Sequence, residues 1–84
     1  GVQADLKTFQ CFSVHGCSVI TAITAQNITE IGKIKSLSPR DILSQINILQ
    51  KDLPPNAVKI GMLDNPSSIE VVKNFLVDYS GKVI

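Results

Sequence analysis

The stretch from Val19 to Asn27 restricts the fold of this chain more than any other. It begins with β-branched residues, carries no charge and ends in two amides, Gln26 and Asn27. An apolar run with little alternation is typical of a strand that is buried on both faces, as in a parallel sheet. Ligands bind at the carboxyl ends of parallel strands, so both amides are candidate ligand contacts. The simpler alternative is that they only satisfy backbone groups at the strand end.

Around this stretch, helices and strands are expected to alternate. The spacing of apolar residues predicts a first helix over residues 2–14, with Gly16 as its left-handed cap. Helix-start signals at Ser38-Pro39 and Asn65-Pro66 predict two more helices, the last closed by Gly81. Strands are expected at residues 17–25, 57–62 and 82–84, and a flap of short strand or loop at 28–37.

This order predicts an α/β fold in which right-handed crossovers connect the strands of a mainly parallel sheet. With 84 residues, the chain makes at most one small domain. Three strands leave unpaired edges and a small core, so residues 1–84 are interpreted as a single partial domain.

Composition excludes several classes of function. The net charge is only +1, from scattered basic and acidic residues, which gives no electrostatic basis for binding nucleic acid or an anionic membrane. Cys11 and Cys17 are interpreted as two buried thiols in a reducing compartment, and one histidine does not complete a zinc site with them. Neither a phosphate-binding glycine loop nor a metal-ligand cluster is present in the sequence.

Three residues are expected to meet at one end of the predicted sheet. Gln26 and Met62 each follow a strand, and Asp5 lies at the start of the helix that returns antiparallel to the first strand. An amide, a thioether and a carboxylate around one crevice suit a small, flat, polar heterocycle. Taken singly, each has a simpler role: a loop amide, a core side chain and a charge in the first turn of a helix.

Four blocks of the sequence together resemble the hydroxymethylpyrimidine and phosphomethylpyrimidine kinases of thiamin biosynthesis, in the ribokinase-like superfamily. The blocks are GVQADLKTF at residues 1–9, GCSVITA at 16–22, TAQN at 24–27 and VKIGML at 58–63. The resemblance implies a three-layer α/β/α ribokinase-like fold, present here only in part. It also implies that Asp5, Thr24, Gln26 and Met62 line a pyrimidine pocket.

The same resemblance implies ATP-dependent phosphorylation of hydroxymethylpyrimidine and its phosphate by a cytoplasmic homo-oligomer, with a dimer as the expected form. No catalytic residue and no metal ligand are assigned within residues 1–84, because ATP and Mg²⁺ would be bound mainly by residues outside this stretch. Residues 1–84 alone are therefore expected to be inactive. The small-molecule pyrimidine is the expected partner, with no nucleic acid and no membrane.

Two departures and two alternatives stay open at this point. Ile28 and Glu30 stand where the family usually has Thr and Gly, which leaves the detail of the flap undecided. A pyridoxal or pyridoxine kinase of the same fold is the alternative enzyme. A non-catalytic binding module is the alternative outside enzymes.

Overall fold

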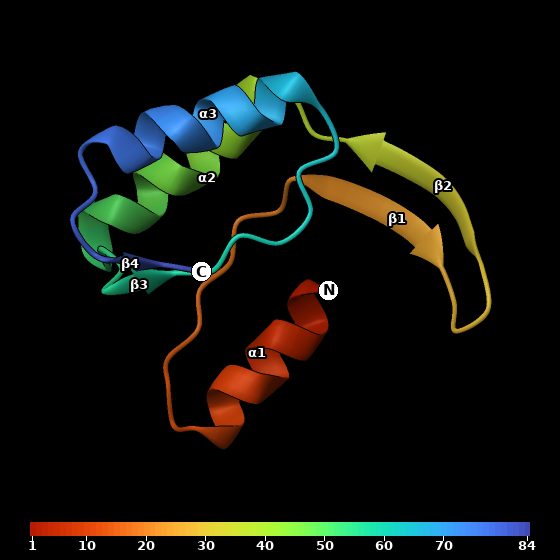
Figure 1. Cartoon of the computed structure of the whole chain (residues 1–84), viewed down its shortest axis with the longest axis horizontal. Helices are drawn as coiled ribbons and strands as arrows, with labels where there is room; N and C mark the ends of the chain where they lie inside the picture. Colours follow the sequence, from red (N-terminus) through yellow and green to blue (C-terminus); the bar gives the residue numbers. More distant parts are fainter.

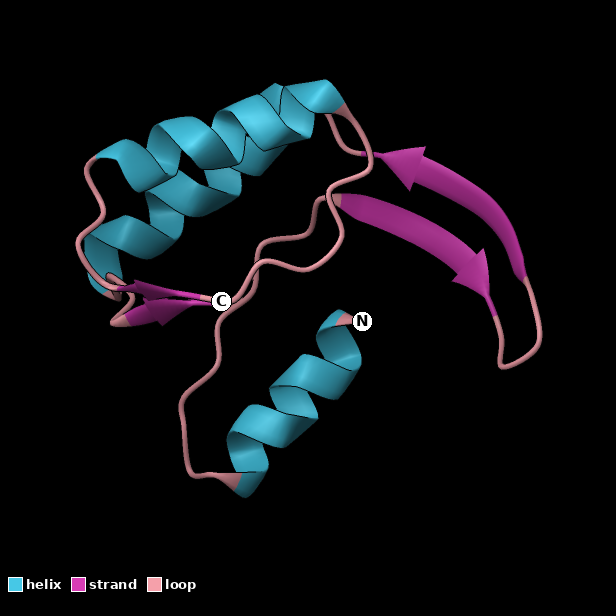
Figure 2. Cartoon of the chain, viewed as in Figure 1, coloured by secondary structure: helices cyan, strands magenta, loops and turns pink.

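The computed structural model describes all residues from Gly1 to Ile84 and contains three helices and four short strands (Figures 1 and 2). Helices α2 and α3 pack against each other, whereas α1 stands apart from them. In chain order, the elements are α1 Val2–Cys11, β1 Ala22–Gln26, β2 Ile31–Ser36, α2 Pro39–Asp52, β3 Ala57–Val58, α3 Pro66–Val77 and β4 Lys82–Val83.

The starts of α2 and α3 are confirmed by their capping geometry. Ser38 Oγ accepts a hydrogen bond from the Asp41 backbone N–H at 3.1 Å, and Asn65 Oδ1 accepts one from the Ser68 N–H at 2.9 Å. A proline follows each cap in the first turn, where its missing N–H costs no helical hydrogen bond. These local signals fix where both helices begin.

Removing either cap should destabilise the protein measurably. Ser38→Ala and Asn65→Ala are each expected to lower the free energy of unfolding by about 1 kcal/mol, because each leaves a helix N–H without its partner. Chemical denaturation of the protein that carries this sequence measures the effect. Ser67→Ala is the matched control, since Ser67 is exposed in the same turn of α3 and caps nothing. Equal stability of cap and control variants would contradict this account.

Strands β3 and β4 form the parallel pair that the alternation of elements predicts. Ala57 lies opposite Lys82, and Val58 lies opposite Val83. Backbone hydrogen bonds of 2.9 Å continue the pairing beyond the strands, from Ile60 N to Ile84 O and from Ile84 N to Val58 O. The parallel relation is confirmed, although the regular strand is shorter than the predicted 57–62.

The prediction of one parallel strand over residues 17–25 is wrong. Only Ala22–Gln26 forms a strand, and it pairs antiparallel with β2 in a hairpin that projects from the rest of the molecule (Figure 1). Residues 17–21 have no strand partner. Instead the Gln45 amide of α2 holds Ile20, accepting from its N–H and donating to its carbonyl, both at 2.8 Å. A side chain thus takes the place of a neighbouring strand.

Two predicted helix ends and the cysteine environment also need correction. Gly16 is not a left-handed cap, because Ser13 has the positive φ of 56° and closes the turn after α1. Gly16 instead allows close packing: a Cβ there would lie 2.9 Å from side-chain atoms of both Leu6 and Phe9. Helix α3 ends at Val77 rather than at Gly81.

Both cysteines are exposed free thiols, not buried ones.

Little of the chain is buried. Ile42 of α2 and Ser68 of α3 are the only fully buried residues, and both lie in the helical layer. Ile69 of α3 is half exposed. None of the helices has the length and apolar character needed to cross a membrane. Many of the partly exposed apolar residues surround a large cavity.

Candidate functional site

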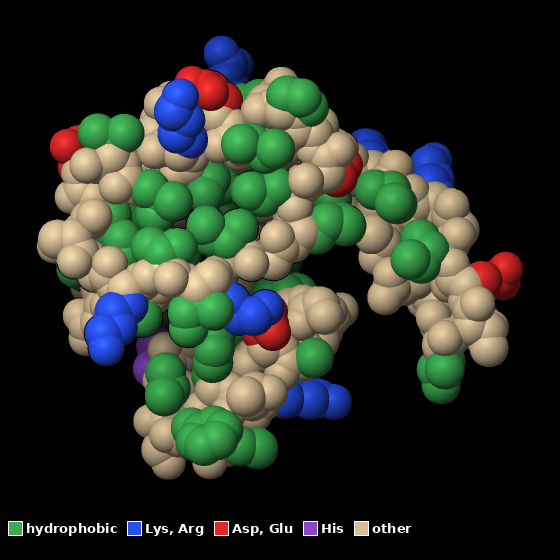
Figure 3. Space-filling view, in the orientation of Figure 1, with side chains coloured by type: hydrophobic (Ala, Val, Ile, Leu, Met, Phe, Trp, Pro, Cys, Tyr) green, Lys and Arg blue, Asp and Glu red, His purple; other side chains and the backbone are tan.

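An open cavity of about 1250 Å³ extends between α1, the segment before β1, the segment after β3 and β1 itself, the first strand of the hairpin. The face shown in Figure 3 is hollowed between α1 and the hairpin. Its lining is mostly apolar, with a few polar side chains among the hydrophobic ones. The structure brings all four residues singled out in the sequence to this lining: Asp5, Thr24, Gln26 and Met62.

The hairpin presents Thr24 and Gln26 on the same face of β1, because successive side chains of a strand alternate between faces. The register shifts after Ala25: Ala25 lies opposite Lys33, but Gln26 lies opposite Ile31. Gly32 is the extra residue of this bulge. A Cβ at Gly32 would lie 3.2 Å from the Ala25 carbonyl oxygen, so a glycine suits this close approach. Bulges of this kind change the direction of neighbouring side chains.

The two amides at the end of β1 have different roles. Asn27 Oδ1 accepts hydrogen bonds from the backbone N–H groups of Thr29 and Glu30 and from the Thr29 hydroxyl, all at 2.9–3.0 Å. Asn27 therefore holds the turn, which is the simpler role considered for it. The Gln26 side chain makes no hydrogen bond within the chain, so its donor and acceptor are both free toward the cavity it lines.

Met62 contributes to the cavity from a segment without regular structure after β3. The Thr21 hydroxyl donates to the Met62 carbonyl at 2.9 Å, which joins this segment to the one that precedes β1. The Met62 side chain is 49% exposed. A flexible thioether at the wall of an open cavity is suited to packing against a flat ring.

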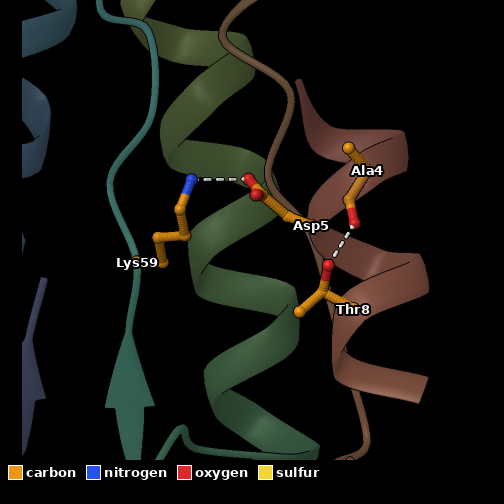
Figure 4. Close-up of polar contacts among 4 residues, drawn as sticks. All are labelled: Ala4, Asp5, Thr8 and Lys59. Atoms are coloured by element: carbon orange, nitrogen blue, oxygen red, sulfur yellow. Dashed lines mark hydrogen bonds and ion pairs between the residues drawn. The ribbon is translucent and has the colours of Figure 1, made fainter. Parts of the chain in front are cut away.

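Asp5 is bound by a residue that the sequence reasoning did not single out. Its Oδ2 lies 2.8 Å from Lys59 Nζ, and the two side chains point toward one another from α1 and the segment after β3 (Figure 4). Both side chains also line the cavity. The signal was present, since Lys59 lies in the VKIGML block that carries the family resemblance, but the resemblance assigned a role only to Met62 in that block.

The described residues offer no metal centre and no paired nucleophile. No three side chains of His, Cys, Asp or Glu gather closely enough to hold a metal ion. His15 is exposed and makes no hydrogen bond or ion pair. The arrangement can bind a ring through apolar contacts, one free amide and one carboxylate.

Comparison with known proteins gives a consistent result. A family model described as phosphomethylpyrimidine kinase matches residues 1–84. The hydroxymethylpyrimidine/phosphomethylpyrimidine kinase of Bacillus subtilis strain 168 is 44% identical over 79 residues, 94% of this chain. The protein of the same name from Synechococcus elongatus is 43% identical over 72 residues, 86% of this chain.

A solved structure agrees with these relatives. The crystal structure of phosphomethylpyrimidine kinase from Clostridium difficile 630 superposes with a TM-score of 0.90 at 44% identity, covering 96% of this chain. The chain spans 27% and 29% of the two relatives named above and 35% of the solved chain. It therefore corresponds to less than two fifths of each of these proteins.

Proposed function

Because this chain belongs to the phosphomethylpyrimidine kinase family, we propose that it supplies the pyrimidine-binding wall of a kinase of thiamin biosynthesis. In this proposal the complete enzyme phosphorylates hydroxymethylpyrimidine and its phosphate with ATP. Residues 1–84 form the substrate side of a single ribokinase-like domain and lack the phosphoryl-transfer residues.

The observation that carries the proposal is the Gln26 amide, which makes no hydrogen bond within the chain and lines the same cavity as Asp5 and Met62. An aminopyrimidine presents ring nitrogens that accept and an amino group that donates, and an amide matches both on one edge. The Asp5 carboxylate accepts from a second donor of the ring, while Met62 and Thr24 contact its face and edge. Each of these four contacts is proposed rather than observed.

ATP and Mg²⁺ complete the proposal, which assigns them mainly to residues outside this stretch. The cap of each of α2 and α3 engages one N–H of the first turn, and no three His, Cys, Asp or Glu side chains gather into a metal-binding cluster in this stretch. When bound, the nucleotide supplies the transferred phosphoryl group, and the residues described here only bind and orient the acceptor ring. The nucleotide site is assigned to the part of the family fold that lies outside the matched region.

Two further aspects of the proposal concern the whole protein. We assign it to the cytoplasm, because both cysteines are exposed free thiols, as is usual in a reducing compartment.

We also propose a homodimer. The exposed isoleucines of the hairpin support association, since exposed apolar patches mark interaction surfaces.

A phosphotransfer assay tests the function. The protein that carries this sequence, supplied with ATP and Mg²⁺, is expected to phosphorylate hydroxymethylpyrimidine with a larger kcat/KM than pyridoxal, with the product identified by mass spectrometry. The reverse preference would favour the pyridoxal kinase alternative. Binding of the pyrimidine without any phosphorylation would favour a non-catalytic binding module.

A further inference from the structure

The only ion pair of the chain lies at the proposed substrate cavity. Lys59 Nζ and Asp5 Oδ2 are 2.8 Å apart, and their side chains are 40% and 30% exposed. The pair joins residues 54 positions apart, and it is the only polar side-chain contact between α1 and the rest of the chain. Thr8, one turn further along α1, instead donates to the Ala4 carbonyl of its own helix (Figure 4).

This ion pair contributes little to the folding stability of the chain. Helix α1 does not pack closely against any other helix or strand, and a partly exposed ion pair contributes little to folding. Its effect on the cavity is more specific. Lys59 occupies one carboxylate oxygen of Asp5, which restricts the rotation of the carboxylate and leaves the other oxygen for a ligand. It also cancels the charge that Asp5 alone would bring to a mostly apolar wall.

We propose that Lys59 is a positioning residue that orients and neutralises the Asp5 carboxylate, so that the cavity selects an uncharged heterocycle over a cationic one. The inference rests on the proposed function, because it assumes that a pyrimidine occupies this cavity. An unpaired carboxylate would attract a ring that carries a permanent positive charge, as a ring-N-methylated pyrimidinium does. A neutral ion pair gives such a ring no electrostatic advantage.

The test compares two probes on the full protein by calorimetry: hydroxymethylpyrimidine and its ring-N-methylated cation. Lys59→Met is expected to weaken binding of the neutral ring and to shift the affinity ratio toward the cation by about fivefold. That factor corresponds to ~1 kcal/mol, the energy of two unit charges about 4 Å apart in water. Lys59→Arg should restore the parental ratio, because its guanidinium also pairs with a carboxylate.

Two controls separate a charge effect from a structural one. Lys7→Met removes an exposed cation of α1, the helix that carries Asp5, that does not line the cavity, and should leave the ratio unchanged. In an Asp5→Asn background, Lys59→Met should no longer shift the ratio, because the charge that Lys59 neutralises is gone. A merely structural role would weaken both probes equally in either background.

The outcomes distinguish the two proposals. If the parent protein binds hydroxymethylpyrimidine and Lys59→Met leaves the ratio unchanged, the role of Lys59 is overturned and the proposed function stands. If the parent binds neither probe, the proposed function fails and the inference fails with it. A variant that shows a changed thermal melt is replaced by Lys59→Gln, which keeps the length and polarity of the side chain.

Discussion

Gln26→Leu is expected to weaken binding of hydroxymethylpyrimidine by roughly tenfold to a hundredfold. The leucine keeps the apolar part of the side chain but removes both the donor and the acceptor, which leaves the polar edge of a bound ring unpaired. Such a group typically costs about 1–3 kcal/mol. Affinity for ATP should barely change, because the proposal assigns the nucleotide site to residues outside 1–84.

Calorimetric titration of the parent and variant proteins with each substrate measures this effect, beside a thermal melt. Gln10→Leu is the matched control, since Gln10 is exposed on α1 and does not line the cavity. Unchanged pyrimidine affinity in Gln26→Leu would remove Gln26 from the site. The Gln26 side chain makes no hydrogen bond within the chain, so the melting temperature should stay the same. A large fall in melting temperature would show that the amide stabilises the strand end instead of binding the ligand.

Gln45→Leu should have the largest effect on stability of the substitutions considered. The Gln45 amide makes two hydrogen bonds of 2.8 Å to Ile20, in a part-buried position where no strand lies beside residues 17–21. Leucine leaves the Ile20 N–H and carbonyl unpaired, so the free energy of unfolding should fall by roughly 2–4 kcal/mol.

Urea denaturation of the full protein measures this loss. Gln50→Leu serves as the control for stability, because Gln50 is exposed on the same helix and makes no hydrogen bond within the chain. If Gln45→Leu unfolds at the same urea concentration as the control, another group or water satisfies Ile20. A change in the slope of the transition alone would instead report a change in the unfolded state.

The helices could be predicted from sequence because their determinants are local. A cap at Ser38 or Asn65 acts on an N–H three residues away, and a proline after it fixes the first turn. The end of α1 was less predictable. Gly16 was the obvious candidate for a positive φ, but the chain turns earlier at Ser13, and close packing against Leu6 and Phe9 explains the glycine.

The pairing of the strands could not be predicted because it depends on distant partners. The β-branched run correctly indicates a strand in its second half, at Ala22–Gln26, but it does not say which neighbour completes the hydrogen bonds. In the structure the first part is held by a side chain of α2 and the second by β2. The bulge at Gly32 interrupts the alternation between Ile31 and Ile34 of β2, whereas Ile28 lies in the turn before this strand.

The candidate site was predictable only in part, because some of its contacts also depend on distant partners. The order of elements indicated that Asp5, Gln26 and Met62 approach one another, and all three line one cavity. Lys59 was not anticipated, because its relation to Asp5 spans 54 positions and the resemblance assigned a role only to Met62 within the VKIGML block. Binding of a ligand by any of these residues stays a prediction.

The turn of the hairpin determines which sequence changes this region tolerates. One side-chain oxygen, Asn27 Oδ1, accepts all three hydrogen bonds from the turn, while the Ile28 side chain is fully exposed and Glu30 contributes only backbone groups. Other residues at positions 28 and 30 should therefore leave the turn and Gln26 in place. Loop length is not free in this way: a residue gained or lost between Asn27 and Glu30, unless the bulge at Gly32 absorbs it, would shift the register and turn the later side chains of β2 to the opposite face.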